Sequence, residues 1–178
     1  MTLTAIGLYP LKGARGTAAP ETAVTPRGLS NDRLWMIVDG DGRFVSQRSH
    51  PALALLEARI RAEGLQLGYP GHQSLHCPRP DGARRLQVGI WSDTVDAADA
   101  GDEAAVWLAG VLGHPARLVY QDDPASRPIP SPKGREGDVV SFADGSPILL
   151  CGEAALADLN TRLDAPVPMD RFLSLIHI

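Results

Sequence analysis

The first hundred residues consist of short apolar runs separated by turn residues, and this spacing constrains the fold more than any other feature. Turn residues recur roughly every eight to twelve positions, which is typical of a barrel or sandwich of short strands. The runs that we expect to form strands lie at 5–11, 23–25, 34–38, 43–48, 53–60, 65–67, 74–77 and 86–91. Residues 53–63 also suit a helix, because they contain many leucines and alanines.

A helix is predicted over 102–112, where apolar residues recur at helical spacing. Asp102 can cap its start, and Gly113 can end it. A short strand is expected at 117–120. Residues 121–138 are polar and rich in proline, so they cannot bury much surface. We expect them to form a mobile loop or a linker between domains.

Ordered structure is expected to resume at 139–142, followed by a turn at 143–147 and a strand at 148–151. A second helix then begins near Glu153, a residue favourably placed in a first helical turn. Its apolar face carries Leu156, Leu159 and Leu163, with Asn160 on the same side, and residues 164–168 end it. The whole pattern indicates an α+β chain that is rich in strands.

The composition excludes several classes of protein. Apolar residues make up 44% of the 178 residues, which is enough for a core. The net charge of −4 argues against general nucleic-acid binding, so any positive site must be local. No apolar run approaches the length of a membrane span, and the N-terminus does not resemble a signal peptide. The two cysteines are far apart in the sequence, which favours free thiols in a reducing cytoplasm.

Three patterns resemble functional motifs but lack a required feature. Residues 39–42 (DGDG) suggest a calcium loop, but Arg43 occupies the fifth position, and a hairpin turn is the better interpretation. In a strand, His72 and His76 would lie about 13 Å apart, which is too far for two ligands of one zinc ion. Residues 13–16 (GARG) are too short for a phosphate loop and lack its Lys-Ser/Thr pair.

Two cations stand at the ends of apolar runs. Lys12 follows the run at 5–11, and Arg33 opens the run at 33–38. A cation beside backbone turns can hold an anion, although a single cation at a strand end is more often simply solvated. The turn at 144–146 can offer N–H groups and a hydroxyl to an anion, although by itself it is more often a plain hairpin turn.

Several segments resemble, in sequence and in order along the chain, the N-terminal β-barrel of MOSC-domain proteins. The branch of that family that they resemble contains the mitochondrial amidoxime-reducing component and its bacterial relatives. These segments are 6–13 (IGLYPLKG), 24–29 (VTPRGL), 32–39 (DRLWMIVD), 42–48 (GRFVSQR), 91–95 (WSDTV), 98–105 (ADAGDEAA), 142–150 (FADGSPILL) and 154–160 (AALADLN). Each segment is generic, but the ordered set is specific. The resemblance implies a MOSC-type β-barrel domain at 1–120, a proline-rich linker at 121–138 and the incomplete start of a MOSC domain at 139–178.

The resemblance also implies a molybdenum cofactor, a pterin that carries a dithiolene and a phosphate. The oxygens of such a group call for Arg, Lys and backbone N–H donors. By resemblance, the cofactor-binding positions are Lys12 and Gly13, Arg33, and the loop Asp144, Gly145 and Ser146. Gly13 stands where the family usually has serine, so one hydroxyl donor is lost.

The resemblance stops near the end of the sequence. The family continues from the position of Phe172 into a long second domain, whereas this chain continues with 173–178 (LSLIHI). The family's molybdenum-ligating cysteine lies downstream, and neither Cys77 nor Cys151 occupies its position. We expect both cysteines to behave as small apolar residues. We also expect a truncated member of the family, with 173–178 derived from read-through at a truncated gene end. An intact gene with a stop codon directly after Ile178 would contradict that expectation.

The resemblance implies that the parent protein reduces N-hydroxylated small molecules by oxygen-atom transfer at molybdenum, and that a redox protein or domain donates the electrons. This chain alone is expected to be inactive, and a cytoplasmic location without nucleic-acid or membrane partners is expected. The wider family is also linked to pyridoxal phosphate, but nothing in the sequence indicates a Schiff base at Lys12. The alternative is a non-catalytic binding module, or one related to sulfur carriers.

Overall fold

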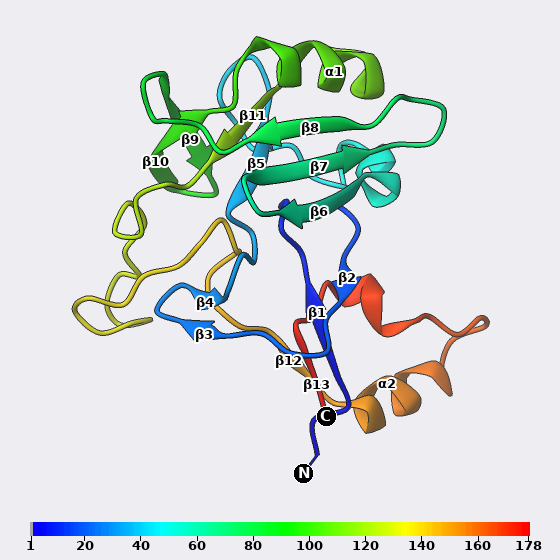
Figure 1. The fold of residues 1–178 in the computed structure, drawn as a ribbon. Coiled ribbons are helices and arrows are strands. Elements are labelled where there is room, and N and C mark those ends of the chain that lie inside the picture. The colour runs from blue at the N-terminus through cyan, green and yellow to red at the C-terminus, as the bar shows by residue number, and fades with distance from the viewer. Residues whose placement is uncertain (1) are drawn as a thin grey trace.

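Two antiparallel sheets make up the larger part of the fold, which we describe from a computed structural model of residues 2–178 (Figure 1). The first sheet has the order β5–β11–β10–β9, and the second has the order β6–β7–β8. Helix α1 (Asp102–Leu112) contacts β11 of the first sheet and β8 of the second. The strands are β5 (Trp35–Val38), β6 (Glu57–Arg61), β7 (Gly64–Gly68), β8 (Leu75–Pro78), β9 (Arg85–Ile90), β10 (Asp93–Asp99) and β11 (Arg117–Tyr120).

Strand β5 separates two hydrophobic cores. Trp35 and Ile37 pack into a core that α1 and the second sheet complete. Met36 and Val38 point the other way, into a core that contains Phe142. Successive side chains of a strand point to opposite faces, so a strand buried on both faces requires an unbroken apolar run. This requirement explains the sequence WMIV.

The two ends of the chain meet in a third sheet with the order β12–β13–β1–β2 (Figure 1). Its strands are β1 (Ala5–Leu8), β2 (Thr17–Ala18), β12 (Leu150–Cys151) and β13 (Ile176–His177). The remaining elements are the hairpin of β3 (Val24–Thr25) and β4 (Gly28–Leu29), helix α2 (Glu153–Asn160), and the 3₁₀ helices η1 (Pro51–Leu55) and η2 (Met169–Phe172). The α+β, β-rich class predicted from the sequence is confirmed.

The first predicted helix is confirmed, with one correction at its start. Helix α1 covers the predicted residues, and Gly113 follows it with a left-handed φ of 76°. Asp102, however, is the first helical residue, and Gly101 occupies the cap position without a side-chain hydrogen bond. Asp102 instead pairs with the guanidinium groups of Arg84 and Arg117.

Other predicted elements differ at their boundaries. Residues 43–48 make only isolated bridges rather than a strand, and residues 53–60 divide between η1 and β6. The second helix ends at Asn160 because its side-chain amide exchanges two hydrogen bonds with the backbone of Val167. Leu163 therefore lies outside that helix.

Residues 121–138 have no helix or strand in the described structure, but two of their side chains are buried. Gln121 is fully buried and Arg127 is only 3% exposed. The expectation that this stretch buries little surface is wrong at these two positions. The domain boundaries at 120 and 138 stay predictions.

The segment 173–178 contains β13, an inner strand of the third sheet that lies between β12 and β1. Ser174 and Leu175 are buried there. The origin of this segment stays a prediction. Among residues 2–178, no helix has the length and apolar character needed to cross a membrane.

Candidate functional site

Three segments that are far apart in the sequence are joined by backbone hydrogen bonds. The N–H of Arg33 donates to the carbonyl of Tyr9, and the N–H of Lys12 donates to the carbonyl of Trp35, both at 2.8 Å. The N–H of Phe142 donates to the carbonyl of Arg33 at 2.9 Å. These bonds hold the end of the β1 segment, the start of β5 and the loop after Phe142 side by side.

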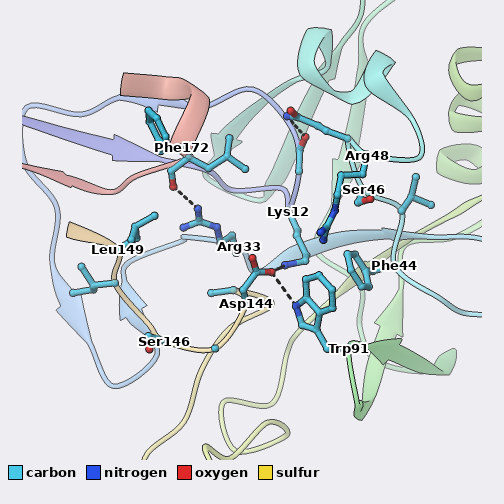
Figure 2. A pocket seen from close by; sticks show the side chains of 17 residues that line it. Lys12, Arg33, Phe44, Ser46, Arg48, Trp91, Asp144, Ser146, Leu149 and Phe172 are labelled. Atoms are coloured by element: carbon cyan, nitrogen blue, oxygen red, sulfur yellow. Dashed lines mark hydrogen bonds and ion pairs between the residues drawn. The ribbon is translucent and has the colours of Figure 1, made fainter. Parts of the chain in front are cut away.

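All six residues predicted from the sequence line one cavity of about 410 Å³ at this junction (Figure 2). Lys12 and Gly13 come from the segment after β1, Arg33 directly precedes the β5 segment, and Asp144, Gly145 and Ser146 come from the loop after Phe142. The structure thus brings the predicted residues together, while their role in binding stays a prediction. The rest of the lining includes Arg48 and the aromatic side chains of Phe44, Trp91 and Phe172, together with aliphatic and uncharged polar residues.

Lys12 and Asp144 form the ion pair at the centre of the cavity. Their Nζ and Oδ1 atoms lie 2.6 Å apart, but only 9% of the Lys12 side chain is exposed, against 73% for Asp144. Burial lowers the pKa of Lys12, and the bond to Asp144 opposes that effect. Burial works to raise the pKa of Asp144, but the hydrogen bond and charge of Lys12 outweigh it, so that pKa lies below its usual value. The pair gives a buried cation whose partner faces solvent.

Arg33, which also lines the cavity, is held in an unusual backbone conformation. Its φ of 48° is left-handed, which is uncommon for a bulky residue and is often found at functional sites. Its guanidinium donates to Asp32 Oδ2 and to the carbonyl of Leu173, each at 2.7 Å, and lies over the Tyr9 ring. Burial raises the pKa of Asp32, and the charge of Arg33 opposes the rise.

Backbone N–H groups add neutral donors to this site. The amides of Gly13, Gly145 and Ser146 donate to no backbone carbonyl in the part of the chain that the structure describes. Gly13 has a left-handed φ of 78°, and its carbonyl accepts a hydrogen bond from the Gln47 side chain at 2.7 Å. This conformation favours glycine, which gives a physical reason for the departure from serine. Free N–H groups beside cations suit an anion.

Arg127, which was not among the residues predicted from the sequence, holds the loop that carries Asp144. Its guanidinium donates to the carbonyls of Ser141, Ala143 and Asp144, and to the Asp93 carboxylate at the start of β10. Four acceptors thus fix one buried side chain. No sequence signal marked Arg127, because its acceptors are mostly backbone carbonyls, whose position depends on the fold.

Trp91 is a second functional candidate that was not among the residues predicted from the sequence. It lies in the turn between β9 and β10, and its Nε1–H donates to Asp144 Oδ1 at 3.1 Å. Its ring packs against Phe44, with ring centroids 5.0 Å apart, and the guanidinium of Arg48 lies over its face. The sequence offered two signals for Trp91: it ends the apolar run at 86–91, and it opens the segment 91–95 that resembles the family.

The lining fits the group that the family resemblance implies. Lys12, Arg33 and Arg48 supply positive charge, and the free amides supply hydrogen-bond donors for phosphate oxygens. Phe44 and Trp91 supply aromatic faces for a flat ring. The donor chemistry therefore matches a planar heterocycle that carries an anionic arm.

Within residues 2–178, no three His, Cys, Asp or Glu side chains are close enough together to hold a metal ion. Cys77 is buried, and burial raises the pKa of its thiol to about 12. This inert thiol agrees with the expected apolar role of Cys77. Cys151 is half-buried in β12 and does not line the cavity.

Comparison with known proteins reveals two kinds of relative. Mitochondrial amidoxime-reducing component 1 of Xenopus laevis is 31% identical over 93% of this chain and 52% of its own length. Mitochondrial amidoxime reducing component 2 of Rattus norvegicus is 31% identical over 96% of this chain and 54% of its own length. The molybdenum cofactor sulfurase of Drosophila grimshawi is 31% identical over 99% of this chain, but over only 23% of its own length.

These matches define what the chain shares with its relatives. The chain spans about half the length of the amidoxime-reducing components that it matches. The family model of the MOSC N-terminal beta barrel domain matches residues 1–115, which is more than half of the chain. The strand-rich fold agrees with that match. The chain therefore belongs to the family of proteins with a MOSC N-terminal beta barrel domain.

Proposed function

We propose that this chain forms the cofactor-binding part of a molybdenum-dependent oxidoreductase that reduces N-hydroxylated compounds. One observation carries the proposal: the six residues singled out by family resemblance line a single cationic cavity, although they come from three distant segments. The names of two relatives, which are amidoxime-reducing components, support the reaction class.

Each residue has a distinct role in this proposal. Lys12 and Arg33 neutralise the phosphate and ring oxygens of the cofactor, and the amides of Gly13, Gly145 and Ser146 donate to the same oxygens. Asp144 fixes the ammonium of Lys12, so that its N–H bonds keep one direction. When bound, the molybdenum cofactor supplies the two-electron oxygen-atom transfer chemistry. The chain itself contributes binding, orientation and charge neutralisation.

The test uses the complete reading frame that contains this chain, expressed in a host that makes molybdenum cofactor. We expect about one molybdenum per polypeptide, as for a tightly held cofactor. We also expect conversion of benzamidoxime to benzamidine with reduced methyl viologen as electron donor. A metal-free protein that leaves benzamidoxime unchanged would contradict the proposal.

The match to the cofactor sulfurase supports a second candidate function. In this case the barrel handles molybdenum cofactor without reducing a substrate, as a binding or sulfur-delivery module. The same experiment separates the two candidates. Protein that carries cofactor but does not reduce benzamidoxime with any of several donors favours the sulfur-delivery function.

A further inference from the structure

Trp91 occupies a backbone position that suits glycine. It is the first residue of the two-residue turn Trp91–Ser92, since Ile90 of β9 pairs with Asp93 of β10. Its φ is 54°. Two-residue hairpin turns place positive φ at this position and favour Gly, Asn or Asp there. A bulky aromatic residue in this conformation is strained, and such strain concentrates at ligand sites.

The strained residue is also exposed and aimed at the cavity. Trp91 is 52% exposed and lines the same cavity as Lys12 and Arg33. Its Nε1–H bond to Asp144 and its contact with Phe44 fix the plane of the indole (Figure 2). The fold thus holds a rigid aromatic ring in the lining of the cavity.

Arg48 covers this face without a counter-ion. Its guanidinium carbon lies 5.0 Å from the indole ring centre, and Figure 2 shows the Arg48 side chain pointing toward Phe44 and Trp91. Unlike Lys12 and Arg33, Arg48 forms no ion pair with any carboxylate of residues 2–178. A ligand can displace it at the cost of one cation–π contact, and the freed guanidinium can then pair with an anionic group.

We propose that Trp91 and Arg48 form a subsite for a planar conjugated ring, with Trp91 supplying the stacking face and Arg48 supplying a cation for an acidic substituent. This inference rests on the proposed function, because it extends the same cavity. The ring belongs either to the pterin of the cofactor or to an aromatic N-hydroxylated substrate. The shared chemistry is a flat π-system that stacks on an indole.

The experiment titrates the purified chain with three probes, by calorimetry. Pterin-6-carboxylate is a flat ring with an anionic arm, benzamidoxime is a neutral aromatic N-hydroxylated compound, and cyclohexanecarboxylate is an anion without a flat ring. The variants are Trp91→Gly, Trp91→Phe and Arg48→Gln. Matched controls are Trp107→Phe on α1 and Arg79→Gln after β8, since neither residue lines the cavity. Circular dichroism checks that each variant is folded.

The subsite predicts selective losses. Trp91→Gly lowers the affinity for pterin-6-carboxylate by about tenfold, which is the usual effect of losing one ring stacked on an aromatic side chain. The same variant keeps the affinity for cyclohexanecarboxylate within about twofold of the parent value, because Lys12 and Arg33 still attract the anion. Trp91→Phe keeps most of the ring affinity. Arg48→Gln lowers the affinity for pterin-6-carboxylate about fivefold and leaves the affinity for benzamidoxime within about twofold of the parent value, because only the first of these two probes is charged.

The outcomes separate the two sources of the ring. Pterin-6-carboxylate binding without benzamidoxime binding assigns the subsite to the cofactor, and the reverse result assigns it to the substrate. The proposal is overturned if the chain binds flat rings no better than cyclohexanecarboxylate, or if Trp91→Gly binds them like the parent chain. A complete protein that lacks molybdenum while ring binding still depends on Trp91 would contradict only the proposed function.

Discussion

At the scale of one residue, the left-handed backbone of Trp91 lowers the stability of the fold. Its φ of 54° costs free energy that glycine would not lose. Comparing Trp91→Gly with Trp91→Ala isolates the free-energy cost of the positive φ, because both variants remove the same indole contacts. We expect the glycine variant to be more stable by about 1 kcal/mol in urea unfolding. Equal stability, or a more stable alanine variant, would show that the turn is unstrained.

The Lys12–Asp144 pair predicts an asymmetry between two single substitutions. Lys12→Met places an apolar side chain in a buried position, so its free energy of unfolding should change by no more than about 1 kcal/mol. Asp144→Ala leaves a buried ammonium without its partner and should cost about 1–2 kcal/mol, at the low end because Asp144 faces water. Urea unfolding of both variants checks the order. The account of the pair is wrong if Lys12→Met is the more destabilising change.

The two cysteines should differ in reactivity. Cys77 is 2% exposed and its pKa is raised to about 12, so its thiol stays protonated and covered at pH 8. Iodoacetamide should label Cys151 in the folded chain and reach Cys77 only after unfolding, which mass spectrometry of tryptic peptides would show.

The raised pKa of Cys77 also fixes the sign of a pH effect. The folded state keeps the thiol proton at a pH where the unfolded state loses it. Stability should therefore fall as pH rises from about 9, the ordinary thiol range, to about 12. Cys77→Ala should show a flatter decline over that window, and an unchanged slope would contradict the assignment.

At the scale of an element, Arg127 fixes the position of the irregular loop at 141–144. Its guanidinium bonds three carbonyls of the 141–144 loop and the carboxylate of Asp93. Lysine cannot match this set of planar donors. Arg127→Lys should cost about 2–4 kcal/mol of stability and speed amide exchange at 143–146.

Arg85 provides the matched control for this prediction. It bridges Asp96 and Asp122 near the surface, so Arg85→Lys should cost less than about 1 kcal/mol. Exchange at 143–146 should be unchanged in that variant. Equal losses of stability and equal amide exchange at 143–146 in the Arg127 and Arg85 variants would contradict the proposed role of Arg127 in holding the loop.

Elements with strong local signals could be predicted from the sequence. Helix α1 has periodic apolar residues and a glycine stop, and β5 has an unbroken apolar run. The end of α2 could not be placed, because it depends on a hydrogen-bonded link between Asn160 and Val167. The burial of Arg127 was likewise hidden, since a proline-rich polar segment normally indicates a loop.

At the scale of the whole molecule, the fold matters because it joins distant segments at one point. The sequence identified Lys12, Arg33 and the loop at 144–146 only through family resemblance, since each is ordinary by itself. Backbone bonds among Tyr9, Arg33 and Phe142 bring these segments together. Trp91 and Arg48 could not be assigned to the cavity beforehand, because their approach depends on tertiary packing.

We propose that this cavity, rather than another part of the protein, holds the molybdenum cofactor. The most direct measurement is the molybdenum content, by mass spectrometry, of the complete protein and its Lys12→Met and Arg79→Gln variants. We predict that Lys12→Met lowers the molybdenum content at least about tenfold, because a buried cation is lost from the anion site. Arg79→Gln should retain the parent content. Full molybdenum content in a folded Lys12→Met protein would contradict the account.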